Sequence, residues 1–271
     1  MGAAVTKPAG AEPPSNYSPL KVPGTVVKDI DGLEAGTNHG RAADKYVYSA
    51  SVVNQWLEKP STQPKNKKIV FVTFDDGPTT KFTGEQLDNL EKAGARATFF
   101  MIPPQMRDVG KNLLSRSLKM GNALAIHSYS HDYKYLYHGS AANKAKHIGC
   151  DWDWAMAQSR AILGSNYFSS AFRYPGGHMS WTNLSQADAA LAKRGVGWID
   201  WNAMSGDADA QRPTTVLGYL EMVKKSIKES NNPNVVVILN HDTYGKQMTA
   251  KAMPSILAWL KSQGYEFGVI A

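Results

Sequence analysis

Short runs of β-branched and aromatic residues alternate with amphipathic helical patterns from Ile69 to the end of the chain. The runs predict strands near residues 69–75, 97–102, 123–127, 171–175, 196–202, 235–240 and 265–270. Strands separated in this way by helices imply repeated βα units, which form a parallel sheet, open or closed into a barrel. The sequence therefore predicts an α/β fold whose chemistry lies at the carboxyl ends of the strands.

The first 64 residues differ in composition from the rest of the chain. They hold seven of the 14 prolines and equal numbers of acidic and basic residues, so the whole positive excess lies after residue 64. We expect an extended, Pro-rich tether through about Asn38 and a short helix over residues 46–57. Residues 1–64 would thus be an N-terminal extension of a main domain that spans residues 65–271.

Composition limits the kinds of protein that this chain can be. Hydrophobic residues make up 42% of the 271, and no apolar run reaches the ~18 residues that a membrane span needs. A single cysteine, Cys150, excludes an internal disulfide framework and a multi-cysteine zinc site. The net charge of +7 suits an anionic partner such as nucleic acid, phospholipid or a wall polymer, and charge alone does not choose among them.

An acidic pair, Asp75 and Asp76, ends the first predicted strand and is followed by Gly77 and Pro78. Neighbouring side chains of a strand point to opposite faces, so both carboxylates can serve one site only if the chain bends there. The Gly-Pro sequence permits such a bend. One aspartate could then hold a cation while the other handles a proton; the alternative is an Asp-Gly turn that caps the next helix.

Two histidines, His127 and His131, follow the third predicted strand. If the chain turns helical there, the i, i+4 spacing places both imidazoles on one face. Two such histidines and one carboxylate make an open zinc site whose remaining position is left to water. The alternative is a pair of surface histidines.

Two further strand ends carry groups that suit catalysis. Arg173 lies in the fourth strand, just before a glycine turn. The arginine could orient a carboxylate, and a free N–H of the turn could meet an oxyanion. An arginine salt bridge beside a tight turn is the alternative. His241 ends the sixth strand, and an unperturbed pKa near 6.5 would let it protonate a leaving group, unless it is a hydrogen-bonded structural histidine.

The strand-end motifs TFDDGP, HSYSH, RYPGG, SGD and LNHD, in this order, resemble the polysaccharide deacetylase family built on the NodB homology domain, carbohydrate esterase family 4. The resemblance covers roughly residues 66–270 and looks closest to bacterial peptidoglycan N-acetylglucosamine deacetylases. It implies a distorted (β/α) barrel of about seven strands and makes residues 65–271 a polysaccharide deacetylase catalytic domain.

The same resemblance assigns roles to residues of this chain. Asp76, His127 and His131 would bind a metal, Zn²⁺ or another divalent transition metal such as Co²⁺. Asp75 would be the general base and His241 the general acid. Arg173 would orient Asp75, and Asp207 would support Arg173 or His241. The N–H of Gly176 would complete an oxyanion hole. The residues that would bind substrate are Tyr174, Leu239 and Trp201. Leu239 or Trp201 would replace the acetate-pocket wall that many members build from Trp where this chain has Ala208.

Since the nitrogen of an amide must be protonated before it leaves, His241 favours N-deacetylation over ester hydrolysis. We therefore expect a zinc-dependent N-deacetylase that acts on N-acetylglucosamine of peptidoglycan. The alternatives are a chitooligosaccharide deacetylase, an acetyl-sugar esterase, or a catalytically silent cell-wall-binding module. No basic-aromatic motif supports a nucleic-acid partner.

The resemblance also leads to expectations about where the protein works. We expect a monomer outside a bacterial cell or at its surface. A signal or anchor is not present in this chain, so we expect any anchoring to the membrane or wall to come from a missing N-terminal segment.

Overall fold

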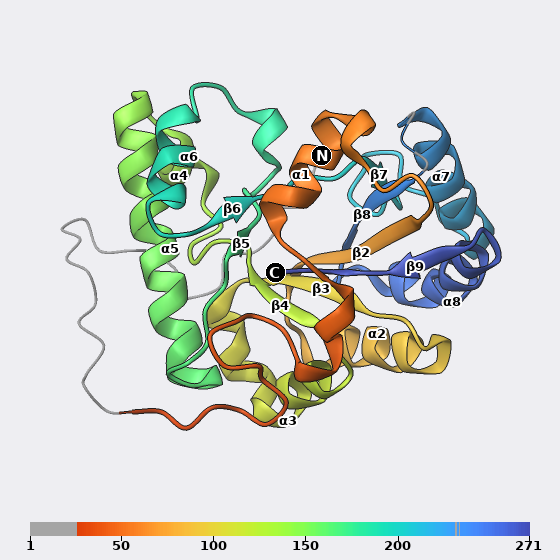
Figure 1. The fold of residues 1–271 in the computed structure, drawn as a ribbon, viewed down its shortest axis with the longest axis horizontal. Helices are drawn as coiled ribbons and strands as arrows, with labels where there is room; N and C mark the ends of the chain where they lie inside the picture. The colour runs from red at the N-terminus through yellow and green to blue at the C-terminus, as the bar shows by residue number, and fades with distance from the viewer. Residues whose placement is uncertain (1–25, 231, 233) are drawn as a thin grey trace.

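The centre of the structure is a curled sheet of parallel strands in the order β6-β5-β4-β3-β2-β8-β7, with β9 paired to β2 (Figure 1). The computed structural model describes residues 26–230, 232 and 234–271. The strands of this sheet are β2 Lys68–Gly77, β3 Ala97–Met101, β4 Ala123–Ile126, β5 Ala171–Phe172, β6 Gly197–Trp198, β7 Ala203–Met204, β8 Val235–His241 and β9 Tyr265–Phe267. A second sheet pairs β1 Val47–Tyr48 with β10 Val269–Ile270.

Helices surround the curled sheet, with α5 and α6 on the left of Figure 1, α3 and α2 below, and α8 and α7 on the right. Each helix of this layer contacts the next in the order α7, α8, α2, α3, α5, α6. The α-helices are α1 Ala50–Glu58, α2 Thr80–Ala93, α3 Met106–Lys119, α4 Tyr133–Tyr137, α5 Ala141–Leu163, α6 Ser185–Ala192, α7 Val216–Glu229 and α8 Gln247–Ser262. Short 3-10 helices are η1 Arg41–Tyr46, η2 Pro60–Thr62, η3 Pro103–Gln105 and η4 His178–Ser180.

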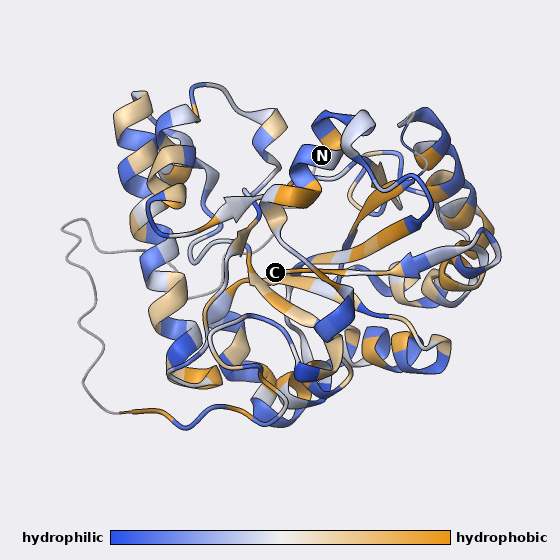
Figure 2. Ribbon diagram, viewed as in Figure 1, coloured by the Kyte–Doolittle hydropathy of each residue, from blue (hydrophilic) through white to orange (hydrophobic). Residues whose placement is uncertain are grey.

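The alternation of side chains along each strand divides the core in two. In β2, Val70, Val72 and Phe74 join the large cluster between sheet and helices, whereas Ile69 and Phe71 join a smaller cluster inside the curled sheet. Figure 2 shows the result, with hydrophobic strands at the centre and helices that are hydrophilic on part of their surface. The inward-facing series of β2 continues through Thr73 to Asp75, which brings Asp75 to the inner face at the carboxyl end of the strand.

Most of the predicted strands are present, but those predicted at residues 196–202 and 265–270 are each replaced by two short strands: β6 and β7 in the first, β9 and β10 in the second. β6 pairs with β5 on one edge of the sheet, and β7 pairs with β8 on the other. Between them, the side chain of Asn202 bonds to the backbone of Val235 and Val237, taking the place of a strand ladder. One continuous segment thus crosses between the two ends of the sheet and gives it the form of a distorted barrel.

The described part of the N-terminal extension, from residue 26 onward, packs against the domain, unlike the tether that the composition predicts. Ile30 and Leu33 lie in the large core cluster, and the backbone around His39 pairs with the start of β4. The predicted tether is therefore wrong for residues 30–38, and the predicted division after residue 64 marks no break in packing within the described chain. The proline-rich residues 1–25 lie outside the described residues. The helix predicted at 46–57 is present as α1, preceded by η1 and β1.

None of the helices in the described part of the chain has both the length and the apolar character needed to cross a membrane.

Removing a core contact of the N-terminal segment tests its contribution to stability. Leu33 is 3% exposed, so Leu33→Ala leaves a cavity and is expected to lower the free energy of unfolding by about 2–5 kcal/mol. Val26→Ala is the matched control, because Val26 is 84% exposed and should change stability little. Urea unfolding followed by circular dichroism measures both. Equal midpoints for the two variants would show that this segment does not stabilise the domain.

Candidate active site

A bulge at the end of β2 brings the two aspartates to one site. Asp75 pairs with Phe100 and Gly77 with Met101 of β3, so Asp76 is an extra residue in the ladder. Asp76 has a φ of 69°, in the left-handed region that non-glycine residues rarely adopt. The bend predicted at Gly77 and Pro78 therefore begins one residue earlier, and it turns both carboxylates toward the same side.

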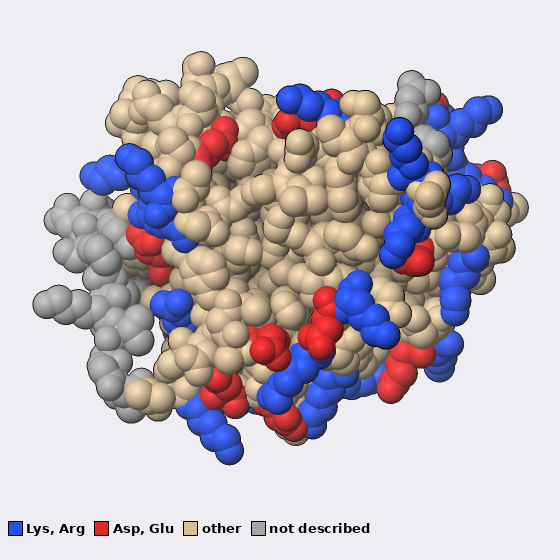
Figure 3. Space-filling view, in the orientation of Figure 1, with Lys and Arg blue, Asp and Glu red and all other residues tan. Residues whose placement is uncertain are grey.

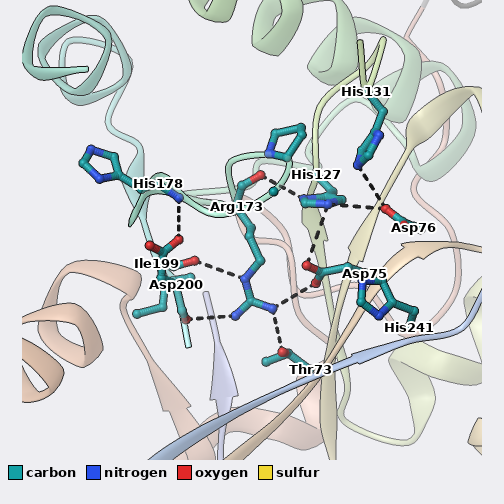
Figure 4. A network of polar contacts seen from close by, with 12 residues as sticks. Thr73, Asp75, Asp76, His127, His131, Arg173, His178, Ile199, Asp200 and His241 are labelled. Atoms are coloured by element: carbon teal, nitrogen blue, oxygen red, sulfur yellow. Dashed lines mark hydrogen bonds and ion pairs between the residues drawn. The ribbon is translucent and has the colours of Figure 1, made fainter. Parts of the chain in front are cut away.

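Asp76, His127 and His131 form a cluster of metal-ligand type, with all three ligand atoms within 4.8 Å of one another. Asp76 Oδ1 lies 3.4 Å from His127 Nε2 and 3.1 Å from His131 Nε2 (Figure 4). This oxygen is buried and has no hydrogen-bond partner of acceptable geometry among the described residues. Burial opposes its charge, yet the two imidazoles hold the pKa of Asp76 well below its usual range.

The donor set fits a divalent transition metal. Two imidazoles and one carboxylate are the ligands of open zinc sites. His127 Nδ1 lies 2.9 Å from the carbonyl oxygen of Arg173, so a proton on Nδ1 would donate there and leave Nε2 free as a ligand. A metal ion of this kind would use the unpartnered Oδ1 of Asp76, the Nε2 of His127, and the Nε2 of His131 from the same loop as His127.

The two histidines are brought together by a loop and not by the helix face that their spacing suggested. Residues 127–131 form a loop after β4, in which Ser128 has a φ of 91° and His131 a φ of 46°. The hydroxyl of Ser128 accepts a hydrogen bond from the His131 N–H at 2.9 Å. The loop curls back on itself, which brings the two ring centroids to 5.0 Å.

Arg173 is fully buried and fixes Asp75 beside the metal-type cluster. Its Nη1 lies 2.9 Å from Asp75 Oδ1 and also donates to the hydroxyl of Thr73. Its Nε and Nη2 donate to the carbonyl oxygens of Ile199 and Asp200 (Figure 4). The other carboxylate oxygen, Asp75 Oδ2, lies 3.7 Å from the Nε2 of a cluster histidine and thus faces the cluster.

His241 stands on β8 directly beside Asp75, because the two residues are partners in the ladder of β2 and β8. Its Nδ1 lies 2.8 Å from Asp207 Oδ1, and its backbone N–H donates to Asp207 Oδ2 at 2.9 Å. Burial disfavours the charged imidazole, but the charge and hydrogen bond of Asp207 outweigh it and raise the pKa of His241 to about 9. Asp207 thus supports the histidine; the hydrogen bonds of Arg173 go to other groups.

The residues predicted to bind substrate are only partly brought together. Trp201 lies at the site, because its ring centroid is 5.6 Å from the Arg173 guanidinium. The ring packs so closely on Gly177 that a Cβ there would lie 2.7 Å from it. Leu239 is buried yet belongs to none of the core clusters of the described residues. Gly176 is in the turn after β5, with a φ of 77°.

The prediction that Tyr174 binds substrate is wrong for its side chain, which is fully buried in the core. Its hydroxyl donates to Asp188 at 2.8 Å. A residue that the motif reasoning missed is Asp200, whose carboxylate accepts the N–H groups of His178 and Met179 and holds the turn after β5. A charged residue within the apolar strand predicted at 196–202 is the signal that could have found it.

Comparisons with known proteins identify the family of this chain. The model of the family described as polysaccharide deacetylase matches residues 62–193. A solved CE4 esterase of Streptococcus mutans is 39% identical, with a TM-score of 0.79 over 90% of this chain and 100% of that one. The chain belongs to the polysaccharide deacetylase family, carbohydrate esterase family 4. The predicted family and distorted barrel are thereby confirmed, and the protein is a deacetylase of the hydrolase class.

Two relatives of this polysaccharide deacetylase show how the domain is used elsewhere. A peptidoglycan-N-acetylglucosamine deacetylase of Bacillus cereus is 28% identical over 204 residues, which are 75% of this chain and 69% of that protein. A bifunctional xylanase/deacetylase of Pseudobutyrivibrio xylanivorans is 31% identical over 210 residues, 78% of this chain. The chain spans 31% of the length of that second relative.

Removing one ligand of the cluster tests whether it binds metal. His127→Ala removes a buried Nε2 ligand and should abolish stoichiometric zinc binding, a larger effect than the ~10–100-fold weakening typical of changes around the ligands. His138→Ala removes an exposed imidazole and should bind zinc as the unmodified protein does. Calorimetric titration of the metal-free proteins with zinc measures both. Retained one-to-one binding in His127→Ala would remove this histidine from the ligand set.

Proposed function

We propose that this protein is a zinc-dependent hydrolase that removes the N-acetyl group from N-acetylglucosamine residues of peptidoglycan. The observation that carries the proposal is the placement of Asp75 and His241, partners on adjacent strands, beside the Asp76, His127 and His131 cluster (Figure 4). A carboxylate and a protonated imidazole beside a metal-type cluster are the groups that hydrolysis of an unactivated amide requires.

Asp75 is assigned the role of general base. A zinc ion, when bound, would lower the pKa of water and polarise the acetyl carbonyl. Arg173 engages Oδ1 of Asp75 and leaves Oδ2, which faces the cluster, to take the proton from the attacking water. The fixed orientation matters because a base must lie within hydrogen-bond reach of the proton that it removes.

His241 is assigned the role of general acid. With its pKa at about 9, the imidazole carries its proton at neutral pH. Asp207 fixes Nδ1, so Nε2 is the atom that can donate to the sugar nitrogen as the C–N bond breaks. An amine leaves poorly as an anion, so the reaction depends on this proton far more for an amide than for an ester.

The turn after β5 supplies the proposed oxyanion contact. No acceptor among the described residues takes the Gly176 N–H, and a backbone donor in this turn can stabilise the developing oxyanion. Trp201, packed against Gly177, and Leu239, outside the core clusters, are assigned to the wall of the acetyl pocket.

Peptidoglycan is favoured as the substrate by the names of the relatives and by charge. Besides the Bacillus cereus protein, a solved catalytic domain from Eubacterium rectale, 28% identical, is named a peptidoglycan N-acetylglucosamine deacetylase. The net charge of +7 suits an anionic wall polymer, and Figure 3 shows Lys and Arg gathered over the side where α7 and α8 lie. We propose that the protein acts as a monomer outside the bacterial cell, at its surface or wall.

Release of acetate from purified peptidoglycan and from N-acetylglucosamine oligomers tests the proposal. We expect zinc-dependent release, abolished by chelator, with peptidoglycan as the better substrate. Asp75→Asn should keep its zinc and lose about 10²–10⁴-fold in kcat, since it removes the base and no ligand. His241→Ala should lose a similar factor on the amide and much less on an acetyl ester of the same sugar.

The outcomes separate the alternatives. Faster release from the oligomers would make the protein a chitooligosaccharide deacetylase, and equal loss of ester and amide cleavage in His241→Ala would remove His241 as the acid. Bound zinc with no release from either polymer would favour the silent wall-binding module.

The pH dependence of kcat tests the link between His241 and Asp207. Because the acid acts in its protonated form, kcat should fall as pH rises through the pKa of His241. Asp207→Asn removes the charge that raises this pKa while burial remains, so the falling limb should move to lower pH. Asp209→Asn, in the same loop and without a hydrogen bond to His241, is the control. An unmoved limb in Asp207→Asn would assign the limb to another group.

A further inference from the structure

A buried carboxylate on α5 holds the loop that carries both histidines of the cluster. This carboxylate is Asp151, which is fully buried. It reaches the loop from α5, a helix that begins well after the loop in sequence. Its Oδ1 accepts the Tyr129 N–H at 2.7 Å, and its Oδ2 accepts the Ser130 N–H at 2.9 Å and the Ser130 hydroxyl at 2.6 Å. The residues that it binds lie between His127 and His131, so these bonds determine the path of the chain from one ligand to the other.

The loop needs such support because its backbone is strained. Ser128 and His131 both have positive φ, a conformation that non-glycine residues keep only when their surroundings impose it. Asp151 accepts hydrogen bonds from Tyr129 and Ser130, the two residues between these strained positions. Without these acceptors, two backbone N–H groups of the loop would lose their partners, and the loop could relax toward ordinary backbone angles.

The position of Asp151 on its helix supports a dedicated role. It lies three residues after Ile148 and four before Ala155, both fully buried in the core cluster, where an apolar side chain would pack. A buried carboxylate is costly unless hydrogen bonds satisfy it. The hydrogen bonds described for this one all come from the loop between the histidines, so its contribution is to that loop.

We propose that Asp151 is a positioning residue for the metal site, setting the affinity and geometry with which His127 and His131 hold a metal ion. The proposal rests on the proposed function, since it takes the cluster to be a metal site. It adds a residue that touches neither metal nor substrate and acts through the loop backbone.

The central test is Asp151→Asn. The amide has nearly the same shape, but its NH₂ group faces an N–H donor of the loop where the carboxylate offered an acceptor. We expect zinc affinity to fall by about 10–100-fold, as for other groups that orient ligands. The absorption spectrum of the Co²⁺-loaded protein should also change, because it reports the ligand geometry, whereas far-UV circular dichroism should not.

Two variants of neighbouring residues make the test specific. Ser130→Ala removes the hydroxyl bond to Asp151 and a longer one, 3.3 Å, that the hydroxyl accepts from the Asp132 N–H, but it keeps both backbone bonds to Asp151. Its loss of zinc affinity should therefore be smaller. Asp153→Asn breaks the ion pair between α5 and Arg194, which is 2.7 Å long, and should lower the melting temperature without changing zinc affinity. A role of Asp151 in helix packing alone would make Asp151→Asn behave like Asp153→Asn.

Each outcome decides between the two proposals. Unchanged zinc affinity and an unchanged Co²⁺ spectrum in folded Asp151→Asn would overturn the positioning role and leave the proposed function standing. If Asp151→Asn does not fold, Ser130→Ala decides, and zinc affinity equal to that of the unmodified protein would overturn the role. Absence of zinc binding in the unmodified protein would instead overturn the metal site itself.

Discussion

The buried ion pair of Arg173 and Asp75 is the interaction on which the rest of the site depends. The guanidinium lies inside the curled sheet, with its centre 4.1 Å from the centroid of the Phe100 ring, and it donates four hydrogen bonds. Two reach β2, and two reach residues 199 and 200 of the segment that crosses between the ends of the sheet. The backbone carbonyl oxygen of Arg173 lies 2.9 Å from Nδ1 of His127. Leaving one charge of such a pair unpaired costs about 3–5 kcal/mol, so the core and the catalytic geometry are stabilised together.

Behind this pair, buried aspartates hold the site loops in place. Asp207 fixes His241, Asp200 holds the turn after β5, and Asp151 holds the histidine loop. A fourth, Asp242, accepts the hydroxyl of Thr83 and gives its N–H to the carbonyl of Asp75. The site loops contain three of the four positive-φ non-glycine residues among those described, so the strain lies where these carboxylates provide support. The carboxylates therefore support the backbone of the loops that carry Asp76, His127 and His131.

Sequence reasoning succeeded where the signal is local. The apolar runs of β2, β3, β4 and β8 are long enough to identify strands, and the parallel arrangement brings their polar ends together. It failed where the determining contact joins distant segments. Asn202 replaces a strand ladder by bonding β8, and Tyr174 turns toward Asp188 in α6. Leu33 belongs to a core cluster whose members come from segments far along the chain. Asp151 carried one local signal, a charge on the apolar face of a helix, but its partners could be seen only in the fold.

In the proposed mechanism, the division of protons between Asp75 and His241 follows from their different surroundings. Arg173 engages Oδ1 of Asp75 and leaves Oδ2 facing the cluster, whereas His241 is paired with Asp207, which favours an imidazolium able to give a proton. The negative charges of Asp75 and Asp76 also help to keep His241 protonated. A cation held by Asp76 would cancel part of that contribution. Asp207 would then be the principal charge that preserves the acid, which explains why this histidine needs a buried aspartate of its own.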